Sequence, residues 1–177
     1  MRCENVKRRI NNLKKYIDSN FELVKENIFS VFMDRAFKLL VPGGFNAQIN
    51  MHAWMFISRF EKYRHVLLKE YSLDSMLHLG PNTFPEISGE VVQNTAFVYL
   101  NMCVKDHVST IHRLVDGDSA EKKDNFIARS GKYNFKCVDF LNIDGSPFVY
   151  WASSAIYDAF SNFDSAGQYI KTREGLA

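Results

Sequence analysis

The side chains that could do chemistry are few and scattered along this 177-residue chain. His107 and His112 are five residues apart, a spacing that gives them a shared face on neither a helix nor a strand. His78 follows an apolar strand pattern, so we expect a hydrogen-bonded structural histidine there. His52 and His65 are expected at the surface or its boundary. The histidines therefore predict no metal site and no catalytic group.

The sequence motifs that commonly mark catalytic or cofactor sites are absent. None of the nine glycines forms a Gly-x-Gly, which excludes the common phosphate-cradling fingerprints. No Gly-x-Ser-x-Gly, His-Glu-x-x-His or Cys-x-x-Cys occurs. The three cysteines have no metal-ligand spacing and are odd in number, so they predict reduced thiols in a cytoplasmic protein.

Composition indicates a globular chain with a core rich in aromatic rings. Hydrophobic residues make up 46% and charged residues 24% of the sequence, and 14% are aromatic. No apolar run approaches membrane-spanning length, and the amino-terminus has no apolar signal region, so no membrane partner is expected. The length suits one domain with an appendage, or two small ones.

The first fifteen residues are strongly basic. They hold six basic residues and only one acid, a net charge of +5, against +2 for the whole chain. Candidate contacts to DNA phosphate are Lys7, Arg8, Arg9, Lys14 and Lys15. The alternative is a solvated face of an amphipathic helix, whose apolar side would carry residues 6, 10, 13 and 17.

Periodicity predicts alternating helices and strands in the middle of the chain. Helices are expected over residues 23–40, 54–71, 119–129 and 150–163. Strands are expected over 45–50, 75–79 and 91–100, a further strand within 104–115, and short strands within 131–142. The 23–40 helix is apolar on two sides and is expected to be buried on both.

The 45–50 strand alternates apolar residues with the amides Asn46, Gln48 and Asn50. Amides on a strand face need water or hydrogen-bonding partners. We interpret this amide side as the wet or partner-facing side of the strand.

Many short phrases, in order, resemble the later half of an adenine-specific DNA methyltransferase of the phage-exclusion (BREX) and restriction-modification type. The likeness runs over about residues 12–177. It is carried by residues 28–36, the Pro-Gly-Gly turn at 42–44, and 51–55, 77–80, 84–86, 90–98, 113–117, 145–147, 150–151 and 172–177.

The resemblance implies an α/β fold: a partial Rossmann-like methyltransferase sheet with flanking helices, followed by a small α+β extension. Residues 1–103 would be the carboxy-terminal half of the methyltransferase domain, and residues 104–177 a linker and the start of the DNA-recognition region. The strands at 45–50 and 75–79 would be the fifth and sixth of the family sheet, and 91–100 its antiparallel seventh. The fifth strand would then have one unpaired edge.

The family's catalytic tetrapeptide (Asn or Asp, Pro, Pro, Tyr or Phe) has no counterpart, because no two of the four prolines are adjacent. The S-adenosylmethionine loop is also missing. S-adenosylmethionine is therefore the cofactor of the parent family, and none is expected for this chain alone. Whether the chain is an enzyme is left open by the sequence.

One family residue carries over. In the family an aromatic residue in the loop between the sixth and seventh strands stacks on the flipped target base, and Phe84 has the matching position. The alternative is that Phe84 anchors its loop on the core.

The sequence leaves two functions open. A third alternative is an unrelated α/β domain that only mimics these phrases. The first is a fragment or split subunit of an adenine-specific DNA methyltransferase, inactive alone. The second is a non-catalytic module that binds DNA or protein. Expected partners are DNA and either a chain that supplies the rest of the sheet or a second copy joined at the open edge.

Overall fold

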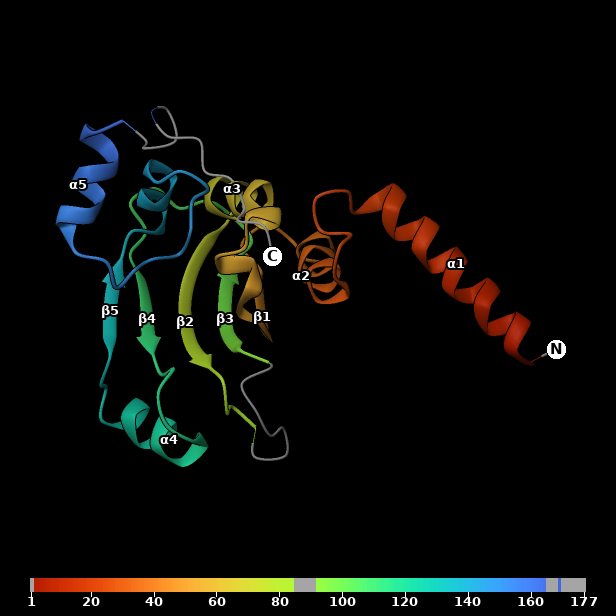
Figure 1. The fold of residues 1–177 in the computed structure, drawn as a ribbon, viewed down its shortest axis with the longest axis horizontal. Coiled ribbons are helices and arrows are strands. Elements are labelled where there is room, and N and C mark those ends of the chain that lie inside the picture. The colour runs from red at the N-terminus through yellow and green to blue at the C-terminus, as the bar shows by residue number, and fades with distance from the viewer. Residues whose placement is uncertain (1, 85–91, 165–168, 170–177) are drawn as a thin grey trace.

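The computed structural model describes residues 2–84, 92–164 and 169. It contains both helices and strands, labelled in chain order in Figure 1. The helices are α1 (Arg2–Asn20), α2 (Ile28–Leu39), α3 (Glu61–Glu70), α4 (Ser119–Ile127) and α5 (Ser154–Asn162). The strands are β1 (Phe45–Met51), β2 (Ser72–Gly80), β3 (Asn94–Leu100), β4 (Ser109–Arg113) and β5 (Lys132–Phe135). The α/β fold class predicted from the sequence is confirmed.

The five strands form one mixed sheet in the order β1-β3-β2-β4-β5. β3 lies antiparallel between β1 and β2, β4 runs parallel to β2, and β5 is antiparallel to β4. The prediction that the 91–100 strand is antiparallel to its neighbours is therefore confirmed. Among the described residues β1 pairs only with β3, so the predicted unpaired edge is present as well.

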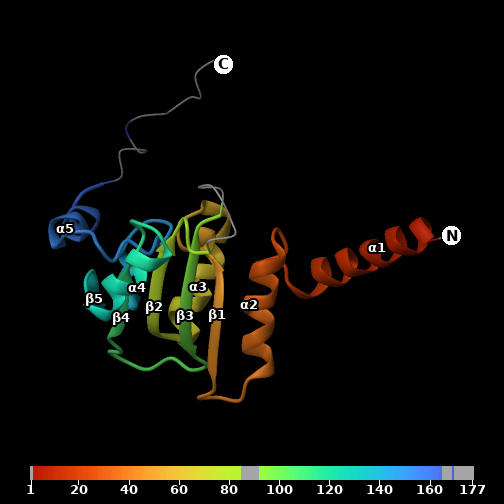
Figure 2. The same ribbon diagram turned by 90° about the horizontal axis from the view of Figure 1, so that it is seen from below.

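One face of the sheet holds the hydrophobic core beneath α2 and α3. Met76, Phe97 and Ile111 project from three neighbouring strands into this core and are at most 2% exposed. Trp54 is fully buried against the rings of Phe97 and Phe148. Figure 2 shows α2 beside β1, and both views show α1 extending away from the sheet.

The helix expected at 23–40 is shorter and less buried than predicted. It begins at Ile28, because the side chain of Asn27 accepts a hydrogen bond from the Phe29 amide and caps the first turn. Burial on two sides is wrong: Ile28 and Phe32 are 50% and 65% exposed, and Leu39 is 69% exposed. Only the opposite side of α2 packs on the core.

The helix expected at 54–71 begins only at Glu61. Residues 52–60 form two short 3-10 turns, with extended backbone at Ile57 between them. The guanidinium of Arg64 donates hydrogen bonds to the carbonyls of Trp54 and Ile57, at 3.0 and 2.7 Å. The Ile57 carbonyl also accepts from the Phe60 amide at 3.0 Å, the i→i+3 bond of a 3-10 turn, so the α-helix begins only after this turn.

The amide side of β1 faces inward, which reverses the prediction that it is wet or partner-facing. Asn46 is 3% exposed and donates to the Met33 carbonyl of α2 at 3.3 Å. Gln48 donates to Asn46, and Asn50 to Gln48, both at 2.8 Å. The amides are one another's partners, and the apolar side with Phe45 and Ile49 is the exposed one.

The later elements agree with the sequence in type. Strands occur within 104–115 and 131–142, and helices within 119–129 and 150–163. The sheet continues past residue 103, since β4 pairs with β2 and β5 pairs with β4. That residues 104–177 begin a DNA-recognition region stays a prediction. The expected loop at 80–90 is described only to residue 84, and 85–91 lie outside the described residues.

Candidate functional site

The carboxyl ends of β1 and β2 lie at the same edge of the sheet, because both strands are antiparallel to β3. This is the edge at which open α/β sheets usually bind ligands. His52 follows β1 directly, His78 lies near the end of β2, and the segment that leads to Phe84 continues from Gly80. We therefore take this carboxyl-end edge as the candidate site.

Two histidines and a tyrosine form a hydrogen-bonded chain there. Nδ1 of His52 lies 2.9 Å from Nε2 of His78, and Nδ1 of His78 lies 2.9 Å from the Tyr150 hydroxyl. One proton between each pair of atoms satisfies both contacts with both rings neutral. Tyr150 is 72 residues beyond His78, so no sequence pattern indicates this pairing.

The surroundings keep these imidazoles neutral. Burial, helped by the nearby charges of His52, Arg113 and Lys122, lowers the pKa of His78 to about 3. Burial also lowers the pKa of His52. Tyr150 holds its proton firmly, because burial raises its pKa well above the usual value. The chain of rings is therefore an uncharged network at neutral pH, and it confirms the prediction that His78 is a satisfied structural histidine.

Aromatic rings surround the histidines and give the edge a partly exposed apolar surface. The Trp151 ring stacks on His78 at 6.1 Å between centroids and 30° between planes, and it is 42% exposed. Phe56 contacts His52, His78 and Trp151 at 5.3 to 5.8 Å between centroids. Flat aromatic surfaces of this kind are suited to stacking on rings such as nucleobases.

Arg64 holds the two segments that carry this cluster. Besides the Trp54 and Ile57 carbonyls, its guanidinium donates two hydrogen bonds, at 2.9 and 2.6 Å, to the carbonyl of Gly145. The side chain is 1% exposed. The loop after β1 is thereby joined to the turn that precedes Tyr150. Sequence reasoning placed no role on Arg64, because its partners are backbone atoms from distant segments.

The residues predicted for DNA contact fall in two separate places. Phe84 is 39% exposed and follows the end of β2 at the carboxyl-end edge. Arg8, Arg9, Lys14 and Lys15 are exposed on α1, which extends away from the sheet (Figure 1). Lys7 lies on α1 too, but its side chain is outside the described set. The structure does not bring Phe84 and these basic residues together.

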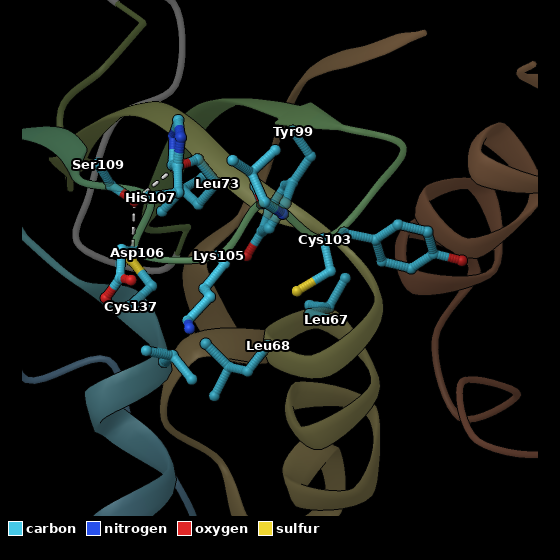
Figure 3. A pocket seen from close by; sticks show the side chains of 14 residues that line it. Leu67, Leu68, Leu73, Tyr99, Cys103, Lys105, Asp106, His107, Ser109 and Cys137 are labelled. Carbon is cyan, nitrogen blue, oxygen red and sulfur yellow. Dashed lines mark hydrogen bonds between the residues drawn. The ribbon is translucent and has the colours of Figure 1, made fainter. Parts of the chain in front are cut away.

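A cavity of about 340 Å³ lies at the opposite edge of the sheet, between α3 and the start of β4 (Figure 3). Ser109 donates to the Leu73 carbonyl there, and its oxygen lies 3.2 Å from Sγ of Cys137. Burial raises the pKa of Cys137 to about 12, so this thiol is no nucleophile. The Ser109–Cys137 pair in this cavity therefore provides no activated nucleophile.

Metal-binding clusters and membrane-spanning helices are both missing from the described part of the chain. No group of three or more histidine, cysteine or acidic side chains gathers there in a metal-binding arrangement. None of the helices within those residues combines the length and apolar character needed to cross a bilayer.

Comparison with known proteins settles the relationship. The family described as Eco57I restriction-modification methylase matches residues 2–84. The adenine-specific methyltransferase BrxX of Escherichia coli O9:H4 (strain HS) is 40% identical over 156 residues, 88% of this chain. The chain is thus similar in sequence to adenine-specific methyltransferases, and its residues 2–84 match the Eco57I methylase family. The resemblance predicted from the short phrases is thereby confirmed.

A second methyltransferase is also similar in sequence, and both relatives are much longer than this chain. The adenine-specific methyltransferase PglX of Lacticaseibacillus casei (strain Zhang) is 37% identical over 148 residues, 80% of this chain. The chain spans only 13% of the BrxX relative and 12% of the PglX relative. Among solved structures, the M protein of the type I restriction enzyme EcoKI aligns over 56% of this chain and 24% of its own, with 17% identity and a TM-score of 0.44.

Proposed function

We propose that this methyltransferase relative supplies one wall of the target-base site of an adenine-specific DNA methyltransferase and transfers no methyl group by itself. The observation that carries the proposal is the carboxyl-end edge, where an exposed Phe84 follows β2 and a partly exposed aromatic cluster surrounds His52 and His78. Phe84 would stack on the adenine that has left the duplex. The parent reaction moves a methyl group from S-adenosylmethionine to the exocyclic amine of that base.

Lack of activity in isolation follows from the chemistry of methyl transfer. The donor and the amine must be held in line at contact distance, and misplacement alone costs orders of magnitude in rate. The 177 residues contain neither the tetrapeptide that would hold the amine nor the loop that would hold the cofactor. The residues expected to hold both reactants would come from another chain or segment.

Stacking by Phe84 is tested by the preference for an unpaired base. Two duplexes are compared by fluorescence anisotropy at low salt, one fully paired and one with a single adenine opposite an abasic position. Flipping costs least for an unpaired base, so we expect tighter binding of the second duplex. Phe84→Ala should reduce that preference by about 1–3 kcal/mol, roughly 5- to 150-fold.

Phe160→Ala is the matched control, because Phe160 is also exposed but lies on α5. It should keep the wild-type preference. If Phe84→Ala keeps the preference as well, Phe84 is a loop anchor and the base-wall proposal is refuted.

The open edge of β1 supports a partner that completes the sheet. Phe45 and Ile49 are exposed on one side of this strand, at 61% and 58%. An unpaired strand flanked by exposed apolar residues recruits another chain. We expect a dimer, or a complex with a chain that supplies the remaining strands, in light scattering. A monomer that stays monomeric at high concentration would argue against this part of the proposal.

A second candidate function is a non-catalytic DNA-binding module, which the exposed basic residues of α1 favour. Replacing Arg8, Arg9, Lys14 and Lys15 by Gln should then weaken DNA binding equally for any sequence and make its salt dependence shallower. If the variant binds DNA as the wild type does, α1 is a solvated helix. Free cysteines at 103 and 137 suit the cytoplasm, where we place either function.

A further inference from the structure

The turn that leads to Phe84 is held by a buried lysine from α4. Lys122 is 4% exposed, and its ammonium donates to the backbone carbonyls of Leu79 at 2.7 Å, Pro81 at 2.5 Å and Val115 at 3.4 Å. An ammonium has three donors, and here each has a carbonyl partner. The three carbonyls come from the carboxyl ends of the parallel strands β2 and β4, so Lys122 joins both strand ends at one point.

Burying an ammonium costs free energy, which indicates that the contacts of Lys122 with the three carbonyls serve a purpose. Among the described residues no carboxylate forms an ion pair with Lys122. Burial lowers the pKa of the ammonium, although Asp116 and Asp118 oppose the shift. An apolar side chain would fill the same space without the cost of desolvating a charge. What only a cation provides is the convergence of three carbonyl oxygens.

The backbone of the turn is also held in conformations that few residues adopt. Gly80 has a φ of +63°, and a Cβ on it would lie 2.9 Å from Cβ of Val115. Asn82 has a φ of +55°, in the left-handed region. Thr83 closes the turn by donating from its hydroxyl to the Gly80 carbonyl at 3.0 Å. Strained backbone of this kind persists where neighbouring contacts enforce it, often beside a functional residue.

We propose that Lys122 is a positioning residue, whose ammonium fixes the turn at 80–83 so that Phe84 is presented to a nucleobase. The proposal rests on the proposed function of Phe84 for its base-facing part. Lys122 itself touches no base. It acts through the carbonyls of Leu79 and Pro81, which set the direction in which the chain leaves β2.

The test measures two quantities in the same variants: the backbone order of the turn and the preference for DNA with an unpaired adenine. Backbone ¹⁵N relaxation of Asn82 and Thr83 should give order parameters near about 0.85 in the wild type and below about 0.6 in Lys122→Met. Order parameters in β3 and α3 and the thermal midpoint report whether the rest of the fold is intact. Lys122→Met should also lose the preference for the unpaired adenine, about as completely as Phe84→Ala.

Two matched variants separate positioning from loss of charge or of stability. Lys123→Met removes the neighbouring, exposed lysine of the same helix and should change neither measurement. Lys122→Arg keeps a cationic donor and should restore part of both. If Asn82 and Thr83 stay ordered in Lys122→Met, or if they become mobile while the base preference persists, the proposal is wrong. If the wild type shows no base preference, the role of Phe84 fails, and the order parameters still decide whether Lys122 fixes the turn.

Discussion

Acid should destabilise this protein through His78. The ring is 5% exposed and sits between His52 and Tyr150, and its surroundings lower its pKa to about 3. In the unfolded chain the same ring titrates near its ordinary value of about 6.5. At a pH between these two values the ring is protonated in the unfolded state and neutral in the folded state. The stability contributed by the neutral ring is therefore complete above about pH 6.5 and is lost as the pH falls toward 3.

The size of the effect follows from the two pKa values. Each pH unit inside the window costs up to about 1.4 kcal/mol for one proton. Between pH 7 and pH 5 the loss from His78 amounts to about 2 kcal/mol, because the first half unit lies above the window. The lowered pKa of His52 acts in the same direction.

Urea unfolding at pH 7 and pH 5, followed by the fluorescence of buried Trp54, measures this loss. His78→Asn removes the titrating ring, so its stability should fall by about 2 kcal/mol less than that of the wild type over the same interval. Equal losses in the wild type and His78→Asn would refute the reasoning.

Two further predictions concern other buried groups. Arg64→Met leaves the carbonyls of Trp54, Ile57 and Gly145 without the guanidinium and should lower the free energy of unfolding in urea by about 3 kcal/mol. Replacing the exposed Arg59 by Met should lower it by less than about 0.5 kcal/mol. Equal losses in the two variants would contradict the role given to Arg64. A thiol reagent at pH 8 should label exposed Cys103 quickly and Cys137 only on unfolding, as peptide mass spectrometry can show, and fast labelling of Cys137 would contradict its burial.

Much of the fold could be predicted because local pattern decides it. The alternation at 45–50 and the pattern at 91–100 predicted the strands β1 and β3, and the resemblance predicted the antiparallel direction of β3. The inward direction of the β1 amides could not be read in the same way. Asn46 is buried because the Met33 carbonyl of α2 accepts from it, a partner that only tertiary packing supplies.

The candidate site was only partly visible in the sequence. Phe84 was found through its place in a family pattern, and His78 through its place on an apolar strand. The contacts that hold the site in place were missed, because they join side chains to distant atoms. Lys122 contacts the carbonyl of Leu79 43 residues away, and Arg64 that of Gly145 81 residues away. A hydrogen bond from a side chain to a distant backbone carbonyl produces no charge pattern and no residue spacing in the sequence.

The most direct test of the central claim is a methyl-transfer assay by complementation. Labelled S-adenosylmethionine and DNA are incubated with this chain, with a methyltransferase polypeptide that carries the cofactor loop and tetrapeptide but lacks the region equivalent to residues 2–164, and with both. We predict no incorporation above background for either one alone and clear incorporation for the mixture. Incorporation by this chain alone, or a mixture no more active than the second polypeptide, would contradict the claim that the chain provides the base-facing wall and not the catalytic groups.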